Sequence, residues 1–146
     1  MKNVDRAVDL FKSGCACSQA ILGAYASDAG LDRTAAMRVA AGFAGGMRAG
    51  GTCGAVTGAI MVLGLKYCTD GCERYEGRQR AYEVVQEFQR RFAARNGSPA
   101  CESLLGVNIA TAEGMQAAME QGLFADRCPS LVQSAAEILD GIMREG

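Results

Sequence analysis

Cysteine is the residue type that can do chemistry in this sequence, because the chain has seven cysteines and no histidine. One of them, Cys53, follows the glycines of the segment RAGGTCGAVTGAIMVLG, residues 48–64, and falls in the first turn of a predicted helix. A thiol there lies against free N–H groups and the positive end of the helix dipole. This placement favours the thiolate, the form that attacks disulfides and binds metals. Cys17, Cys101 and Cys128 also fall at or near predicted helix starts, so these four cysteines are the candidate site residues.

The spacing of the cysteines matches no compact metal or redox motif. The sequence has no C-x-x-C, so it predicts neither a thioredoxin-like motif nor a zinc ribbon. Without histidine, covalent haem attachment through C-x-x-C-H, histidine-containing zinc sites and cysteine–histidine hydrolases are excluded. If the four helix starts converge, their thiols suit thiol–disulfide exchange or a soft metal. If they do not, the cysteines only pack as small hydrophobic residues.

The three remaining cysteines lie away from these positions. Cys15 follows Phe11 at helical spacing on the apolar stripe of the first predicted helix, so we expect it to pack in the core. Cys68 and Cys72 flank Asp70-Gly71, a predicted turn. Because these two are close in sequence, they can form a local disulfide, extend a metal site or do neither.

Length and charge exclude several classes of protein. The chain has 146 residues and a net charge of −1, which suits a single domain over 1–146 with a buried core. Acidic and basic residues are mixed, so we expect no nucleic-acid binding. The longest apolar run, inside residues 55–65, is too short for membrane insertion, and the charged N-terminus does not resemble a signal peptide. We expect a cytoplasmic protein, and in a reducing cytosol cysteines more often serve redox, catalytic or metal-binding roles.

Apolar periodicity predicts a compact all-α bundle of six to seven helices, because no segment alternates with a two-residue period. The predicted elements are a first helix with Val4, Ala7, Val8 and Phe11 on one face, helices over about 17–26, 53–67, 76–95 and 112–120, a helix capped by Asp32, a short helix capped by Ser98, and a last helix that begins at Cys128-Pro129. The last helix is expected to bury Leu131, Val132, Ala135, Ile138, Leu139 and Ile142.

Two glycines in the predicted central helix need a compensating reason, since glycine in a helix costs roughly 1 kcal/mol relative to alanine. Gly54 and Gly58 are four residues apart and create a ridge that another segment can approach closely. We interpret Gly58 as a packing residue and leave Gly54 open between packing and access to Cys53. Arg48 can steer an anionic substrate or lower a thiol pKa, but simple solvent exposure is the favoured interpretation.

Four segments carry a family resemblance: GCACSQAIL, GFAGGMRAGGTCGAVTGAIMVLGLKY, ACESLLG and CPSLVQSAAEILDGIM, in that order. They resemble the redox-active protein family named for its C_GCAxxG_C_C cysteine pattern, and the match covers almost the whole chain. The resemblance implies that the family's four cysteines are Cys17, Cys53, Cys101 and Cys128. The same sequence type is similar to the non-haem part of split-Soret cytochromes, in which an iron–sulfur centre accompanies the haems. Family members are often encoded near membrane transporters, which implies a functional link to such a transporter.

Three hypotheses follow for the function. The first is a cytoplasmic thiol redox protein of the thiol oxidoreductase class, in which Cys53 is the reactive thiolate and Cys17 or another helix-start cysteine resolves the mixed disulfide. Its partner would be a redox protein, a small thiol or a metal species. The second is an iron–sulfur or zinc carrier with Cys17, Cys53, Cys101 and Cys128 as ligands. The third is an interaction module whose cysteines only pack.

Overall fold

The computed structural model describes residues 2–146 and confirms the predicted all-α fold. Over that range seven helices have eight or more residues, one has five, and no strand occurs. The helices are α1 (Lys2–Lys12), α2 (Cys17–Tyr25), α3 (Arg33–Ala40), α4 (Gly54–Tyr67), α5 (Gln79–Asn96), α6 (Cys101–Leu105), α7 (Ala112–Glu120) and α8 (Leu123–Glu145), with short turns η1 (Ala41–Phe43), η2 (Gly46–Gly50) and η3 (Glu76–Arg78).

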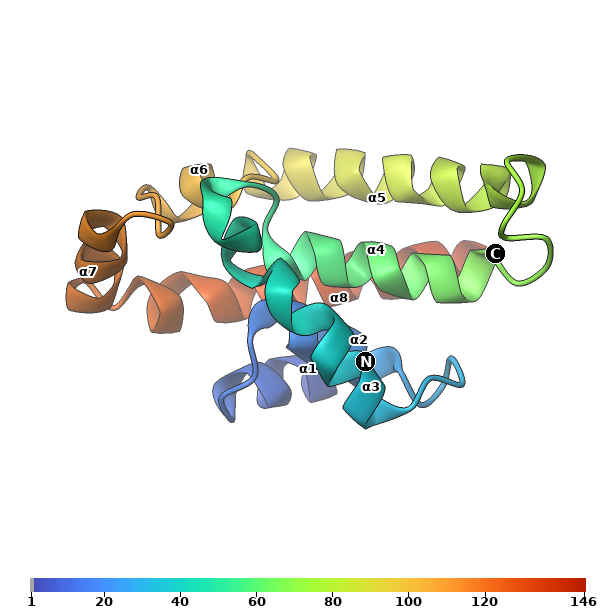
Figure 1. The fold of residues 1–146 in the computed structure, drawn as a ribbon, viewed down its shortest axis with the longest axis horizontal. Helices are drawn as coiled ribbons and strands as arrows, with labels where there is room; N and C mark the ends of the chain where they lie inside the picture. Colours follow the sequence, from blue (N-terminus) through green and yellow to red (C-terminus); the bar gives the residue numbers. More distant parts are fainter. Residues whose placement is uncertain (1) are drawn as a thin grey trace.

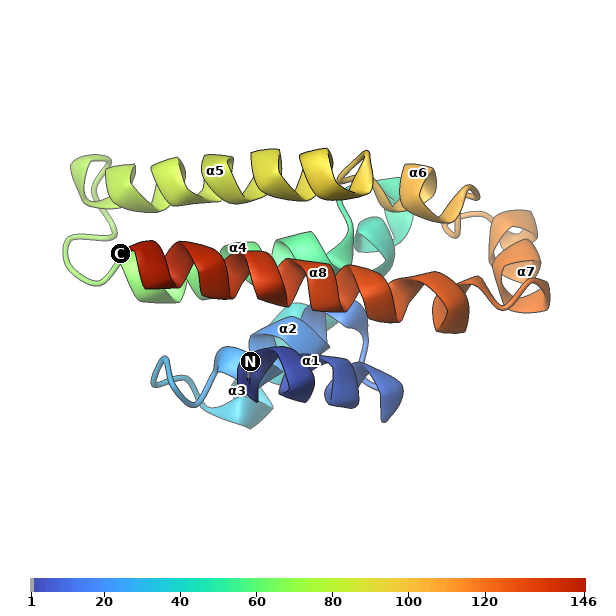
Figure 2. The same cartoon turned by 180° about the vertical axis from the view of Figure 1, so that it is seen from behind.

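Helix α4 lies at the centre of the bundle because it is apolar on nearly all sides. Helices α5 and α8 run along it, α2 packs on its other side, and α1 packs against α2 and α8 (Figure 1). The view from behind shows α8 crossing in front of α4 and extending past it to α7 (Figure 2). The predicted core face of the last helix is confirmed, since all of its members are buried: Leu131, Val132, Ala135, Ile138, Leu139 and Ile142.

The contact between α2 and α4 is the most extensive in the fold, and Gly58 makes it possible. A Cβ at Gly58 would lie 2.8 Å from the carbonyl oxygen of Ser18 and 3.0 Å from Cβ of Ile21. The packing interpretation of Gly58 is therefore confirmed. The start of α3 is also as predicted, because the Asp32 carboxylate accepts a hydrogen bond from Ala35 N–H at 2.9 Å.

Two predicted helix starts are wrong. Helix α8 begins at Leu123, after Gly122 in the left-handed conformation, so Cys128 lies in the second turn and Pro129 lies inside the helix. The physical reason is that Leu123 is buried in a second apolar cluster, which extends the helix beyond the proline. Ser98 accepts a hydrogen bond from Ala100 N–H, and Ala100 rather than Ser98 is the N-cap of α6.

The glycine-rich segment before α4 forms a left-handed turn. Four consecutive residues, 45–48, have φ between +55° and +64°, including the non-glycine residues Met47 and Arg48. Such residues cost about 1–2 kcal/mol each in this conformation. The turn closes with a hydrogen bond from Gly51 N–H to the Gly46 carbonyl at 3.0 Å.

Among the residues described, no helix combines the length and the apolar character that crossing a bilayer demands.

Candidate functional site

All four candidate cysteines line one cavity of about 190 Å³. The cavity lies where two apolar clusters meet. Cys17 and Cys53 belong to the main core, whereas Cys101 and Cys128 belong to the smaller cluster built by α6, α7 and the start of α8. The rest of the wall is mostly apolar and comes from both clusters, with Phe11, Leu104, Leu105, Met115, Phe124 and Leu131 as its large side chains.

Hydrogen bonds at the start of α2 fix the position of Cys17, the first residue of that helix. The Gln19 side chain accepts a hydrogen bond from Ala16 N–H at 3.0 Å and donates one to the Met37 carbonyl at 3.0 Å. The buried hydroxyl of Ser18 donates to the Ala40 carbonyl at 2.7 Å. These bonds attach the helix start to α3, so the Cys17 thiol is held at the cavity wall by a rigid backbone.

Four donors surround the sulfur of Cys17. The Cys53 thiol donates a hydrogen bond to it, and so do the backbone amides of Gly45, Ser18 and Cys17 itself. These donors lower the pKa of Cys17 to about 6, and the Cys53 thiol has the largest effect. Burial opposes the shift but is outweighed. Cys17 is therefore the thiol that ionises first in this cavity.

Cys53 has the opposite electrostatic character, although it is the N-cap residue of α4. Its pKa is raised well above 9.0, because its proton is engaged with Cys17 and its side chain is buried. The amide of Ala55 favours the Cys53 thiolate, but this helix-terminus effect is the smaller one. The sequence argument that a helix start favours a thiolate thus applies in this pair to Cys17.

A two-residue backbone bridge joins the segments that carry Cys53 and Cys101. Thr52 and Ala100 form an isolated antiparallel bridge. Cys53 N–H donates to the Pro99 carbonyl at 2.7 Å, and Cys101 N–H donates to the Gly51 carbonyl at 2.7 Å. The bridge explains how α6, distant in sequence, brings its cysteine to the cavity wall.

Cys101 and Cys128 are protonated at neutral pH. Burial raises the pKa of Cys101 to about 11 and that of Cys128 to about 12, and the neighbouring Cys17 thiolate adds to both shifts. These thiols therefore contribute sulfur and an apolar surface to the cavity, and negative charge is confined to Cys17.

The sequence was compared with protein-family models, curated proteins and solved structures. The family model described as "Putative redox-active protein (C_GCAxxG_C_C)" matches residues 15–142. The chain belongs to this family. No curated protein and no solved structure gives a significant match.

Gly54 directly follows Cys53 at the start of α4. A Cβ at Gly54 would collide with Sγ of Cys17 and would lie 3.1 Å from Cα of Ala44. The absence of a side chain at this position therefore makes room for the Cys17 sulfur. The sequence left Gly54 open between packing and access to Cys53, and this close approach favours packing.

Among the described residues that line the cavity, Arg48 is the only cationic one. Its side chain is exposed, as the sequence analysis favoured, yet its position in the left-handed turn places it at the edge of the cavity. The backbone amide of Gly45 is the functional group that sequence reasoning missed. The consecutive glycines at 45 and 46 are the signal that could have pointed to it, because they permit the left-handed turn.

Two further expectations concern the three cysteines that do not line the cavity. Cys15 is partly buried and packs against the main core, which agrees with the packing interpretation. Cys68 and Cys72 form a disulfide, so the first of their three alternatives is the one observed. No set of three or more Cys, Asp or Glu side chains within residues 2–146 is arranged to hold one metal ion.

Proposed function

We propose that the cavity is a thiol–disulfide exchange site, with Cys17 as the attacking thiolate and Cys53 as the resolving thiol. The observation that carries this proposal is the position of Cys17 and Cys53 on one cavity wall, where hydrogen bonding from the Cys53 thiol is the largest cause of the lowered pKa of Cys17. Cys17 is also less buried than Cys53, so an incoming disulfide reaches it first. Cys53 was expected to attack because of its place before α4, and in this proposal Cys17 attacks and Cys53 resolves.

The reaction balances with these two groups alone. The Cys17 thiolate attacks one sulfur of a disulfide RSSR, which forms a Cys17–SR mixed disulfide and releases RS⁻. That thiolate accepts the proton of Cys53, and the Cys53 thiolate attacks the Cys17 sulfur. The products are a Cys17–Cys53 disulfide, RSH and RS⁻. RSSR is reduced by two electrons, and the cysteine pair is oxidised by two.

Oxidised glutathione is a suitable probe, used on the reduced protein in a Cys15→Ser/Cys68→Ser/Cys72→Ser background so that only the cavity thiols react. We expect the product to be a Cys17–Cys53 disulfide, identified by mass spectrometry after acid trapping. Cys53→Ser should stop at a glutathione adduct on Cys17, because no resolving thiol is left. If Cys17→Ser forms a glutathione adduct at Cys53 as fast as the parent protein reacts at Cys17, the assignment of roles is wrong.

A soft-metal or iron–sulfur site is the second candidate function, and the four sulfurs on one apolar cavity favour it. Such a group would supply Lewis acidity or electron transfer at the cavity. The arrangement described above does not yet bring three sulfurs into a ligand set, so metal binding would require Cys101 and Cys128 to move toward Cys17. Visible absorption and metal analysis of anaerobically purified protein test this candidate, and a colourless, metal-free, folded protein would count against it.

A further inference from the structure

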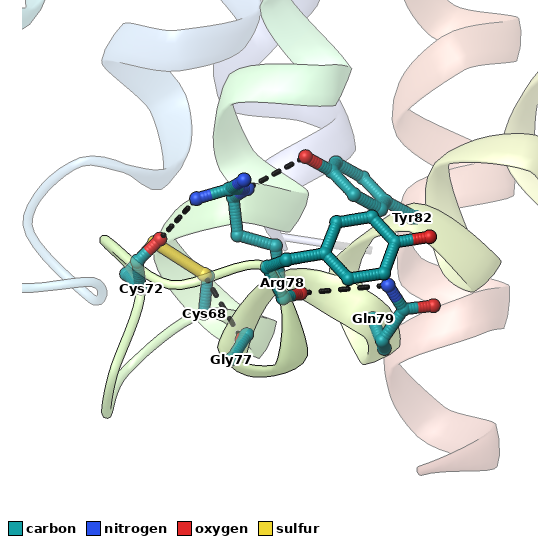
Figure 3. Close-up of a disulfide and its surroundings, with 7 residues drawn as sticks. Cys68, Cys72, Gly77, Arg78, Gln79 and Tyr82 are labelled. Carbon is teal, nitrogen blue, oxygen red and sulfur yellow. Dashed lines mark hydrogen bonds between the residues drawn. A yellow bond between two sulfur atoms is a disulfide. The ribbon is translucent and has the colours of Figure 1, made fainter.

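The other end of α4 carries a second pair of cysteines. Cys53 is the N-cap of this helix and Cys68 is its C-cap, and Cys68 is joined to Cys72 by a disulfide (Figure 3). Fourteen helical residues separate the two ends, which corresponds to roughly 21 Å at 1.5 Å per residue. The sulfurs at the two ends therefore cannot exchange directly within one molecule.

The two sulfurs of this disulfide differ in access. Cys72 is exposed, in the turn between α4 and η3, whereas Cys68 is partly buried under the Gly77 backbone. Sγ of Cys68 lies 3.4 Å from the Gly77 carbonyl oxygen. In the reduced protein this oxygen can accept a hydrogen bond from the Cys68 thiol, so both oxidation states have a partner for Cys68.

The turn is held in place by contacts that do not involve sulfur. Arg78 donates to the Cys72 carbonyl at 3.2 Å and to the Tyr82 hydroxyl at 2.6 Å (Figure 3). The Gly71 carbonyl packs so tightly on Gly77 that a Cβ there would collide with it. Because the backbone and Arg78 fix the turn, the two sulfurs remain close when the bond between them is broken.

We propose that Cys68–Cys72 is a second thiol–disulfide exchange site whose substrate is a dithiol reductant. A thiolate of the dithiol attacks the exposed Cys72 sulfur, forms a mixed disulfide and releases the Cys68 thiolate, which takes up a proton. The second thiol of the reductant loses its proton. It then attacks the reductant sulfur that is bonded to Cys72 in the mixed disulfide. This step closes a disulfide in the reductant and releases Cys72, so two electrons pass to the cysteine pair.

The test equilibrates the purified full chain with dithiothreitol in defined ratios of its reduced and oxidised forms. Thiols are then trapped with acid and alkylated, and each cysteine is scored by mass spectrometry. We expect Cys68 and Cys72 to be reduced and reoxidised together and reversibly, with unchanged far-ultraviolet circular dichroism. A disulfide that is reduced only after the chain is unfolded, or one that never forms, would overturn the proposal.

Single-cysteine variants test which sulfur is attacked. Cys68→Ser leaves Cys72 available to oxidised glutathione, and we expect it to form the mixed disulfide about tenfold faster than Cys72→Ser, because exchange rates depend on access to the sulfur. Equal rates, or a faster Cys68, would contradict the proposed direction of attack. All arms are repeated in a Cys17→Ser/Cys53→Ser background, so failure of this site is distinguishable from failure of the cavity site.

Discussion

Cys17 is stabilised as a thiolate without any imidazole. In many cysteine enzymes a neighbouring cationic histidine lowers the pKa of the thiol. This chain has no histidine, and the neutral thiol of Cys53 and the amide of Gly45 supply the donors instead. The stabilisation therefore depends on donor geometry, and single substitutions can test it.

The first prediction concerns the pH dependence of alkylation. In the reduced protein, iodoacetamide should modify Cys17 with a midpoint near pH 6, because its pKa is lowered to about 6. Cys101 and Cys128 should stay unreactive until much higher pH, since their pKa values are about 11 and 12. Alkylation followed by peptide mass spectrometry over pH 5–9 measures each rate, and a Cys17 midpoint above pH 8 would show that the donors do not act as described.

The second prediction tests whether the hydrogen-bond donor at position 53 lowers the pKa of Cys17, as opposed to the presence of any side chain there. Cys53→Ala removes the hydrogen-bond donor and should move the alkylation midpoint of Cys17 upward by at least about one pH unit, since hydrogen bonding to the charged form favours it. Cys53→Ser keeps a donor and should give a smaller shift. Equal midpoints in the two variants would mean that the donor is not responsible for the lowered pKa.

The third prediction compares alanine substitutions at two glycines of α4, one beside the Cys17 sulfur and one with open space around it. Gly54→Ala should displace the Cys17 sulfur and reduce its alkylation rate at pH 7 several-fold, because the new Cβ collides with Sγ. Gly64→Ala is the control, since no atom lies within 4 Å of a Cβ there. An unchanged Cys17 rate in Gly54→Ala would show that the contact is not restrictive.

At the scale of elements, the packing of α2 on α4 can be tested by equilibrium unfolding in urea. Gly58→Ala should lower the free energy of unfolding by about 1–3 kcal/mol, as overpacking does, because the carbonyl of Ser18 is backbone and cannot move away cheaply. Gly64→Ala in the same helix should leave the free energy unchanged or raise it by up to about 1 kcal/mol. Equal stabilities of the two variants would contradict the close approach at Gly58.

The sequence predicted most elements because their signals are local. The cap at Asp32, the apolar faces of the helices and the position of Cys53 before α4 all follow from neighbouring residues. The start of α8 does not, because burial of Leu123 in a cluster formed with α6 and α7 outweighs the helix-start signal of Pro129. Local patterns contain no information on that contact.

The candidate site likewise combines features that local sequence predicts with features that depend on tertiary contacts. Four cysteines could be selected by type and spacing, but their convergence depends on the bridge between Thr52 and Ala100. The low pKa of Cys17 depends first on the Cys53 thiol and then on the amide of Gly45, a residue of the left-handed turn, and both contacts are made only in the folded chain. Burial of Cys53 likewise follows from tertiary packing.

At the scale of the whole molecule, the ionisation of Cys17 couples pH to stability. Its folded-state pKa of about 6 lies below its ordinary value of 9.0, so the unfolded chain binds more protons between these values. The free energy of unfolding of the reduced protein should therefore rise with pH from 6 to 9, by at most about 1.4 kcal/mol per pH unit. It falls as pH decreases through 6.

Urea titrations at several pH values measure this dependence, and Cys17→Ser is the control. The raised pKa values of the other cavity thiols act only above pH 9, and no histidine titrates in the window. The variant should show a flatter profile between pH 6 and 9. An identical slope in both proteins would assign the pH dependence to another group.

The backbone bridge between the glycine-rich turn and α6 gives the cavity a built-in spectroscopic reporter. The amides of Cys53 and Cys101 belong to the same residues as two of the cavity sulfurs, and each is fixed by a hydrogen bond of 2.7 Å across the bridge. In nitrogen-15 NMR spectra their resonances should be sharp, slow to exchange with deuterium and sensitive to any change at either sulfur. Oxidation of the cavity can thus be followed in the intact protein, without attaching a label to a thiol that would itself disturb the chemistry.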